Sequence, residues 1–254
     1  MGKSYSKVIK VLLILTVLFV TFYLVTNYMF NSTVYDAKLT STPQVWAHAA
    51  YLDKSRSNPL NLIGKAFQNG ASGVELDVFY DEKTQDFVLT HDSPYFRYGG
   101  KLFFLHQVFE RFKQRGYYWI DFKNLSFSNY SKARDRMLKL LNKYQLFHLV
   151  YVESTNGLLL RTYSSHGIRT IFWIAYDRNW TRPFKFLYLK AIIGFSRFNG
   201  ISSPYQRIGD PYFMKTFGHL PIFLFTLNRK SLFDHYVQRK NIHVILTKRF
   251  YKKR

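Results

Sequence analysis

The sequence predicts an α/β fold, a (β/α)8 TIM barrel, with a single transmembrane helix at its N-terminus. The first observation is an alternation of strand-like and helical segments after about residue 39, and the second is an uncharged apolar run before it. Strands that alternate with helices imply parallel strands, and eight repeats in roughly 200 residues are what this barrel needs. A doubly wound open sheet is the alternative architecture.

The N-terminal run covers residues 11–30 and carries no charge, and it is long enough to cross a bilayer as a helix. Lys3, Lys7 and Lys10 precede it. The positive-inside rule therefore places residues 1–10 in the cytoplasm and the chain after about residue 31 on the periplasmic, extracellular or lumenal side. The alternative is a cleaved signal peptide, but its apolar part is usually shorter and ends in a small-residue cleavage site. We expect an uncleaved anchor.

The remainder contains no low-complexity linker and no short-period repeat, so we expect a linker at 31–43 and a single barrel domain at 44–254. Eight runs have the length and the β-branched or aromatic composition of strands. They are QVWAHAA, GVELDVFY, YYWIDFKN, LVYVES, RTIFWIAY, NGISSPY, PIFLFTLN and HVILTK. Four segments between them have helical spacing, several closed by glycine. They are PLNLIGKAFQNG, LHQVFERFKQRG, YSKARDRMLKLLNKYQ and NGLLLRTYSSHG.

Composition limits the partners. The chain has 37 Lys and Arg against 15 Asp and Glu, a formal net charge of +22, which attracts an anionic membrane surface, nucleic acid or phosphorylated molecules. The chain has no cysteine, which excludes disulfides, thiolate metal sites and a thiol nucleophile. We do not expect nucleic acid as a partner, because the chain shows no nucleic-acid-binding motif and the anchor separates the domain from the cytoplasm.

Acidic residues are therefore scarce, yet Glu75 and Asp77 lie two apart within an apolar strand segment. Strand side chains alternate between faces, so both carboxylates point to one side. If that side is the barrel interior, a cation such as Mg2+ or Ca2+ offsets their repulsion. The alternative is an exposed face on which both pair with lysines. The next strand segment favours the interior, because Asp121 and Lys123 repeat the spacing.

Two histidines stand near predicted strand ends, His48 and His91. One can act as a base and the other as an acid near neutral pH. A metal, two histidines and a lysine together suit phosphodiester cleavage, because the cations offset phosphate charge while the histidines move protons.

These residues resemble the pattern of the glycerophosphodiester phosphodiesterases, a family within the superfamily of barrel phosphodiesterases that includes phosphatidylinositol-specific phospholipase C and venom sphingomyelinase D. The family pattern runs from His-Arg-Gly through a Glu-Asn-Thr segment to Glu-x-Asp, His-Asp and Glu-x-Lys. The corresponding segments here are HAA, SNP, GVELDV, THD and IDFK. The clear similarity covers about residues 44–124.

The resemblance implies a fold, a reaction and roles for single residues. His48 and His91 would be the catalytic acid and base, and Lys123 would contact the phosphate. Glu75, Asp77 and Asp121 would hold one divalent cation, Mg2+ or Ca2+. Asn58, Ser154 and Asn228 would be further residues of the substrate pocket.

Two positions depart from the family pattern: Ala49 stands where the family has arginine, and Lys248 stands where many members have aspartate. We therefore expect a membrane-anchored, metal-dependent phosphodiesterase that hydrolyses glycerophosphodiesters or phospholipid headgroup diesters by histidine acid/base catalysis. The alternative is a catalytically impaired barrel that binds a phosphorylated ligand or a lipid.

Overall fold

The computed structural model describes residues 2–33, 43–49, 58–174 and 182–249. The chain forms two compact units, one made of Met1–Val34 with Tyr176–Arg197 and the other of Tyr35–Ala175 with Phe198–Arg254. Most of the expected linker, 34–42, lies outside the described residues.

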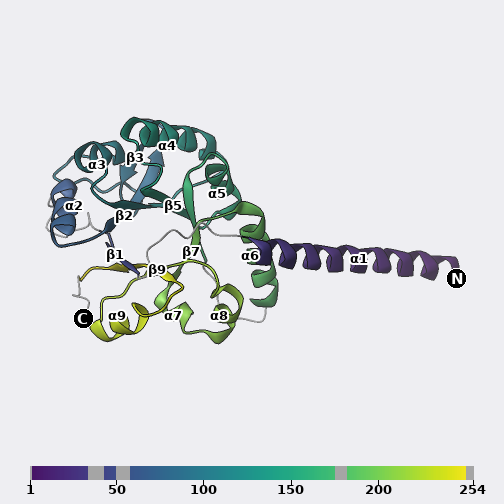
Figure 1. Ribbon diagram of the computed structural model, residues 1–254. Coiled ribbons are helices and arrows are strands. Elements are labelled where there is room, and N and C mark those ends of the chain that lie inside the picture. The colour runs from purple at the N-terminus through teal and green to yellow at the C-terminus, as the bar shows by residue number, and fades with distance from the viewer. Residues whose placement is uncertain (1, 34–42, 50–57, 175–181, 250–254) are drawn as a thin grey trace. The chain divides into compact units, whose positions relative to one another are not determined.

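The first unit consists of α1 (Gly2–Ser32) and α6 (Arg182–Ser196). The stretch Lys7–Ser32 of α1 has a mean hydropathy of 2.7 and is long and apolar enough to cross a membrane. In Figure 1, α6 runs across the C-terminal end of α1. The glycine at position 194 permits this approach, because a Cβ there would lie 2.9 Å from the backbone nitrogen of Phe30.

The second unit is a closed barrel of eight parallel strands, and its closure excludes the open sheet. Around the barrel, neighbouring strands pair in the order β1-β9-β8-β7-β6-β5-β4-β2, and β2 pairs with β1 to close the ring. The strands are β1 (Gln44–Ala47), β2 (Gly73–Asp81), β4 (Tyr117–Phe122), β5 (Val150–Ser154), β6 (Arg169–Trp173), β7 (Gly200–Pro204), β8 (Ile222–Phe225) and β9 (Ile242–Thr247). All eight predicted strand segments are thus confirmed.

Helices follow most strands, and the four predicted ones are confirmed. They are α2 (Pro59–Gln68), α3 (Leu105–Phe112), α4 (Tyr130–Tyr144) and α5 (Gly157–Ser164). Three more follow β7 and β8 in the chain, namely α7 (Tyr205–Ile208), α8 (Pro211–Phe217) and α9 (Lys230–Tyr236). Within this unit the helices lie outside the strands (Figure 1).

One further strand is not among the eight predicted barrel segments. β3 (Asp86–Leu89) pairs antiparallel with β2 and forms a hairpin outside the eight-strand ring. Its first residue, Asp86, is buried and accepts two hydrogen bonds from Arg136 of α4, at 3.0 and 2.7 Å, and lies 2.7 Å from His106 Nδ1 of α3. This network ties the hairpin to two helices and so holds the segment that leads to His91.

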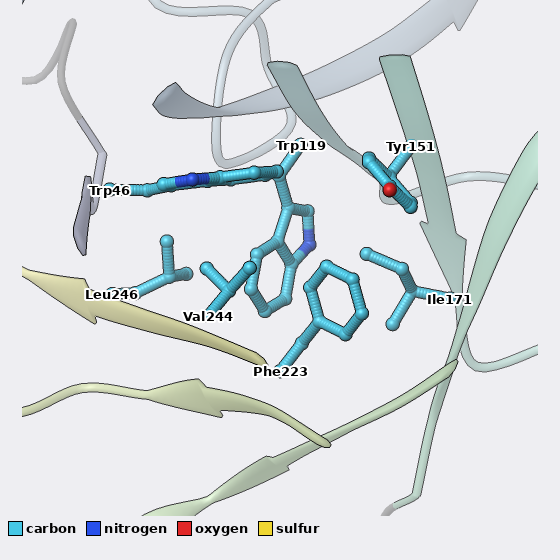
Figure 2. Close-up of a cluster of buried hydrophobic side chains, with 7 residues drawn as sticks. All are labelled: Trp46, Trp119, Tyr151, Ile171, Phe223, Val244 and Leu246. Atoms are coloured by element: carbon cyan, nitrogen blue, oxygen red, sulfur yellow. The ribbon is translucent and has the colours of Figure 1, made fainter. Parts of the chain in front are cut away.

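Aromatic and aliphatic side chains fill the barrel interior. Figure 2 shows the ring of Trp119 among the other side chains of this cluster, which all belong to barrel strands. The cluster comprises Trp46, Trp119, Tyr151, Ile171, Phe223, Val244 and Leu246, all nearly inaccessible to solvent. Trp46 lies directly over Gly73, where a Cβ would come within 2.6 Å of the indole ring. This packed layer closes the barrel below the polar residues at the C-terminal ends of its strands.

Candidate active site

The predicted catalytic, metal-binding and phosphate-binding residues surround one cavity of about 270 Å3 at the C-terminal ends of the barrel strands. Its walls are formed by His48, Ala49, Glu75, Asp77, His91, Trp119, Asp121, Lys123, Glu153, Trp173, Phe225, Leu246 and Lys248. Barrel enzymes carry their chemistry at this end, because the strand ends and the loops after them converge there.

Three carboxylates form an acidic cluster in the cavity. Glu75 and Asp77 lie on β2 and Asp121 lies opposite Asp77 on β4. All three are buried, and each offers an oxygen within 4.8 Å of the other two. Burial raises the pKa of Glu75 well above its ordinary value, and the charges of Asp77 and Asp121 act in the same direction. The structure therefore places the Glu-x-Asp pair inside the barrel. A cation there would offset the repulsion between the buried carboxylates.

Lys123 supplies one cation to this cluster. It follows β4, and its Nζ lies 2.6 Å from Asp77 Oδ1 and 2.5 Å from Asp121 Oδ2. Burial opposes its charge, but Asp121 and Asp77 outweigh burial and raise the pKa of Lys123 above its ordinary value. Burial also raises the pKa of Asp121, although Lys123 opposes that effect.

The backbone of Ala49 contacts Glu75, the carboxylate of the cluster that Lys123 does not pair with. Its N–H donates a hydrogen bond to Glu75 Oε2 at 2.5 Å, and its φ of 46° lies in the left-handed region. This conformation turns the peptide after His48 toward Glu75 and costs a non-glycine residue about 1 kcal/mol. The short side chain of Ala49 adds no charge to the cavity wall.

His48 lies just after β1, where its backbone N–H donates to Thr247 O of β9 at 3.0 Å. Burial lowers its pKa to about 4, and the positive charge of Lys248 acts in the same direction. Its Nδ1 is buried and has no hydrogen-bond partner among the described residues. His48, which lines the cavity, is therefore a neutral imidazole at physiological pH.

His91 occupies the rim. It follows β3 and is exposed, and its Nδ1 lies 2.8 Å from Asp92 Oδ1. When Nδ1 carries the proton, Asp92 accepts it in a hydrogen bond and Nε2 is free to transfer a proton. The neighbouring Thr90 fixes this turn, because its N–H donates to Asp77 O at 3.1 Å and its Oγ1 donates to Asp92 O at 2.9 Å.

Three kinds of lining residue were not among the predicted site residues. Glu153 of β5 is buried one strand beyond Asp121, which it faces in the strand register, and it accepts a hydrogen bond from Ser202 Oγ. Burial raises the pKa of Glu153 well above its ordinary value. Lys248 adds a second cation, exposed at the mouth. An aromatic wall is formed by Trp119, Trp173 and Phe225.

The three further pocket candidates lie elsewhere. Asn58 caps α2, where its Oδ1 accepts a hydrogen bond from Leu60 N at 2.9 Å. Ser154 Oγ accepts from Asn156 N at 3.2 Å, and Asn228 Oδ1 accepts from Lys248 N at 3.0 Å. None of the three lines the cavity described above. Asn228 nevertheless fixes the backbone of Lys248, which does line the cavity.

The donor set fits a hard divalent cation. Mg2+ and Ca2+ bind carboxylate oxygens at about 2.0 to 2.6 Å, so oxygens within 4.8 Å of one another can share one ion. The chain has no cysteine, and carboxylate oxygens are the ligands that these cations prefer. Such a cluster beside two histidines can bind a phosphate group and move protons around it.

No family model matches the chain, and no curated protein matches it in sequence. Solved structures do match. A glycerophosphodiester phosphodiesterase from Thermotoga maritima superposes with a TM-score of 0.62 at 21% identity, covering 81% of this chain and 94% of that one. One from Parabacteroides distasonis gives a TM-score of 0.64 at 16% identity, covering 82% and 94%.

A phosphodiesterase from Oleispira antarctica, solved in complex with the product sn-glycerol-3-phosphate, gives a TM-score of 0.58 at 14% identity. It covers 82% of this chain and 93% of the other. At these identities the likeness establishes the fold, which is the (β/α)8 barrel of the glycerophosphodiester phosphodiesterase structures.

Proposed function

We propose that the chain is a membrane-anchored, metal-dependent phosphodiesterase of the glycerophosphodiester phosphodiesterase family. The observation that carries the proposal is the cluster of Glu75, Asp77 and Asp121 in one cavity with His48 and His91. These are the residues that correspond to the family motifs. They come from separate strands, and the likeness of fold to solved phosphodiesterases supports the same reading.

Each residue has a part in the reaction. Glu75, Asp77 and Asp121 would hold a divalent cation, which when bound offsets the negative charge of the phosphate. Lys123, between two of these carboxylates, contacts a phosphate oxygen. His48 is neutral, so it accepts the proton of the attacking hydroxyl, either water or a neighbouring hydroxyl of the substrate. His91 at the rim donates a proton to the departing alkoxide.

The substrate class follows from the same cavity. Its cations and the proposed metal ion select a phosphodiester, and sn-glycerol-3-phosphate as the product of the Oleispira antarctica enzyme favours a glycerol-based one. We assign glycerophosphodiesters or phospholipid headgroup diesters as substrates. The chain's net charge of +22 favours an anionic membrane surface as the place of action.

The topology follows from α1. Lys3, Lys7 and Lys10 precede the center of the apolar stretch, so its N-terminal end is cytoplasmic and the barrel lies on the opposite side of the membrane. The proposed organisation is a cytoplasmic segment at 1–10, an anchor at 11–30, a linker at 31–43 and the barrel domain at 44–254.

A catalytically impaired barrel that binds a phosphorylated ligand or a lipid is the second candidate. Ala49 favours it, because arginine at the corresponding family position offers two parallel hydrogen bonds to phosphate and alanine offers none. Lys248 does not separate the two candidates, because a cation that lines the cavity attracts a phosphate group whether or not it is cleaved.

The test uses the full-length chain purified in detergent. Glycerophosphocholine, lysophosphatidylcholine and sphingomyelin are incubated with it in Mg2+ or Ca2+, and then with chelator. Headgroup release that disappears with chelator and in His48→Ala and Glu75→Ala, but persists in the exposed control His166→Ala, supports the enzyme. Binding of these diesters without turnover would support the impaired barrel instead.

A further inference from the structure

The helix α6 has an exposed aromatic stripe. Phe184, Tyr188 and Phe195 are 64%, 57% and 41% exposed. At about 100° per residue, Tyr188 and Phe195 lie within about 40° of Phe184 around the helix axis. The three rings therefore form one continuous apolar strip along most of the helix.

The opposite side of α6 is also apolar. Phe186, Leu189 and Ile193 are buried and lie about 140° to 200° around the helix from Phe184. A helix that buries one face and shows the other to water normally carries polar residues on the outer face. The outer stripe of α6 carries rings instead, which indicates that it does not face bulk water.

A third side of α6 contacts the end of α1. Lys190 Nζ donates to Asn27 Oδ1 at 2.8 Å and lies 5.4 Å from the centre of the Phe30 ring. Gly194, one turn along, brings the two backbones together, because a Cβ there would lie 3.1 Å from Met29 Cβ. The contact falls on the last turns of the apolar stretch Lys7–Ser32, where a membrane-crossing helix leaves the hydrocarbon.

We propose that α6 is an interfacial helix that lies in the headgroup region of the same bilayer that α1 crosses, with Phe184, Tyr188 and Phe195 in contact with lipid. A helix that runs across the end of a membrane-spanning helix lies along the membrane plane (Figure 1). The inference rests on the proposed role of α1 as an anchor.

Composition identifies the lipid partner. Aromatic side chains are enriched where a protein meets the membrane–water interface. The segment Arg182–Ser196 contains Arg182, Lys185 and Lys190 and no Asp or Glu. Lys185 lies about 100° around the helix from Phe184, and a basic residue at the edge of an apolar strip is complementary to anionic phospholipid headgroups. The partner is therefore a bilayer that contains anionic phospholipid.

The natural chain has no cysteine, so single cysteines can carry a fluorescent nitrobenzoxadiazole label. The full-length chain is reconstituted into vesicles of phosphatidylcholine and phosphatidylglycerol with label at one of four positions. Tyr188→Cys and Phe195→Cys report the stripe, and Leu18→Cys reports the middle of α1. Phe127→Cys is the matched control, because Phe127 is also an exposed ring, at 75%, in the barrel unit. Quenching by iodide and by lipids with a nitroxide near the headgroup or deep in the acyl chain is compared.

The proposal expects the stripe labels to be quenched severalfold more by the headgroup-region nitroxide than the Phe127 label, and to be protected from iodide. The Leu18 label is expected to respond to the deep nitroxide. Stripe labels as open to iodide as the Phe127 label, with Leu18 in lipid, would overturn the inference and leave the anchor standing. An iodide-accessible Leu18 would overturn both. Stripe labels shielded from every quencher would show that protein, not lipid, covers α6, and would also overturn the inference.

Discussion

The backbone N–H of Ala49 hydrogen bonds to Glu75 Oε2 at 2.5 Å, which links the turn after β1 to the acidic cluster on β2. Glutamine at position 75 keeps an oxygen for this hydrogen bond but removes a buried negative charge. This substitution therefore tests what the charge does to stability and to metal binding while the hydrogen bond from Ala49 is kept.

Glu75→Gln is expected to stabilise the metal-free chain near neutral pH by about 1 to 3 kcal/mol. The pKa of Glu75 is raised above its ordinary 4.5 by burial, so ionising this group costs more in the folded chain than in the unfolded chain. Because the folded chain holds the proton of Glu75 more tightly than the unfolded chain does, the unfolding free energy falls as pH rises above 4.5. Denaturant unfolding in chelator measures the gain. Adding Mg2+ or Ca2+ should then raise the Tm of the wild type but not of the variant, and an equal rise in both would contradict the metal assignment.

The stability of the chain is expected to fall as pH drops from 6.5 to about 4 in part because of His48. The folded-state pKa of His48 is depressed, so the unfolded chain binds a proton in this range and the folded chain does not. His48→Gln should flatten this part of the profile, measured as the difference in unfolding free energy between variant and wild type. The control is His166→Gln, an exposed histidine, and a similar flattening in that variant would show that the effect is not specific to His48.

Gly73→Ala is expected to destabilise the barrel by about 1 to 3 kcal/mol, because the new methyl group would overlap the buried Trp46 ring. Gly64→Ala on α2 makes the same chemical change where the nearest atom is at 3.6 Å, an ordinary contact, so it should be neutral or stabilising. Thermal unfolding of both variants measures the contrast. Equal stability would mean that Trp46 can move away from Gly73.

Lys248→Ala is expected to raise KM for an anionic phosphodiester by about tenfold, with a smaller change in kcat, if this cation binds substrate charge at the mouth of the cavity. Arg249→Ala removes the same charge one residue later, from a side chain that does not line the cavity. Steady-state kinetics of both variants separates a local contact from the general field of the protein. The same rise in KM in both would assign the effect to net charge alone.

Gly194→Ala is expected to loosen the contact between α6 and the last turns of α1, because the new Cβ would lie 2.9 Å from Phe30 N and 3.1 Å from Met29 Cβ. Hydrogen exchange of the last turns of α1 measures the contact, and faster exchange is expected in the variant. The control is Gly64→Ala on α2, where the nearest atom lies at 3.6 Å. Unchanged exchange in both variants would argue against a close α1–α6 contact.

The barrel could be predicted from the sequence because each strand is a short apolar run with its own boundaries. The limits of β3 and α6 were harder to predict. β3 is only Asp86–Leu89 and is stabilised by Arg136 and His106, which are distant in the chain. The α6 segment is apolar on both its buried face and its exposed stripe, so it has no polar side to reveal a helical period.

The candidate site was predictable where residues of one strand share a face. Glu75, Asp77, Asp121 and Lys123 do converge, as the two-residue spacing suggested. Glu153 carried the same kind of signal, a carboxylate within an apolar strand, but only the register Asp121↔Glu153 brings it to the cavity. Asn58 and Ser154 instead accept hydrogen bonds from backbone N–H groups two residues further along the chain. Their positions in the motifs do not show that these side chains are used for local backbone contacts.

The pairing of β1 with β9 has a consequence for how the barrel folds. The two strands pair from Gln44↔Val244 through Ala47↔Thr247, so the strands that close the barrel lie about 200 residues apart in the chain. Contacts between such distant segments form slowly, because a long loop must close before they are gained. A truncation that removes β9 would leave an unclosed sheet edge at β1, and such a species is prone to aggregation or proteolysis.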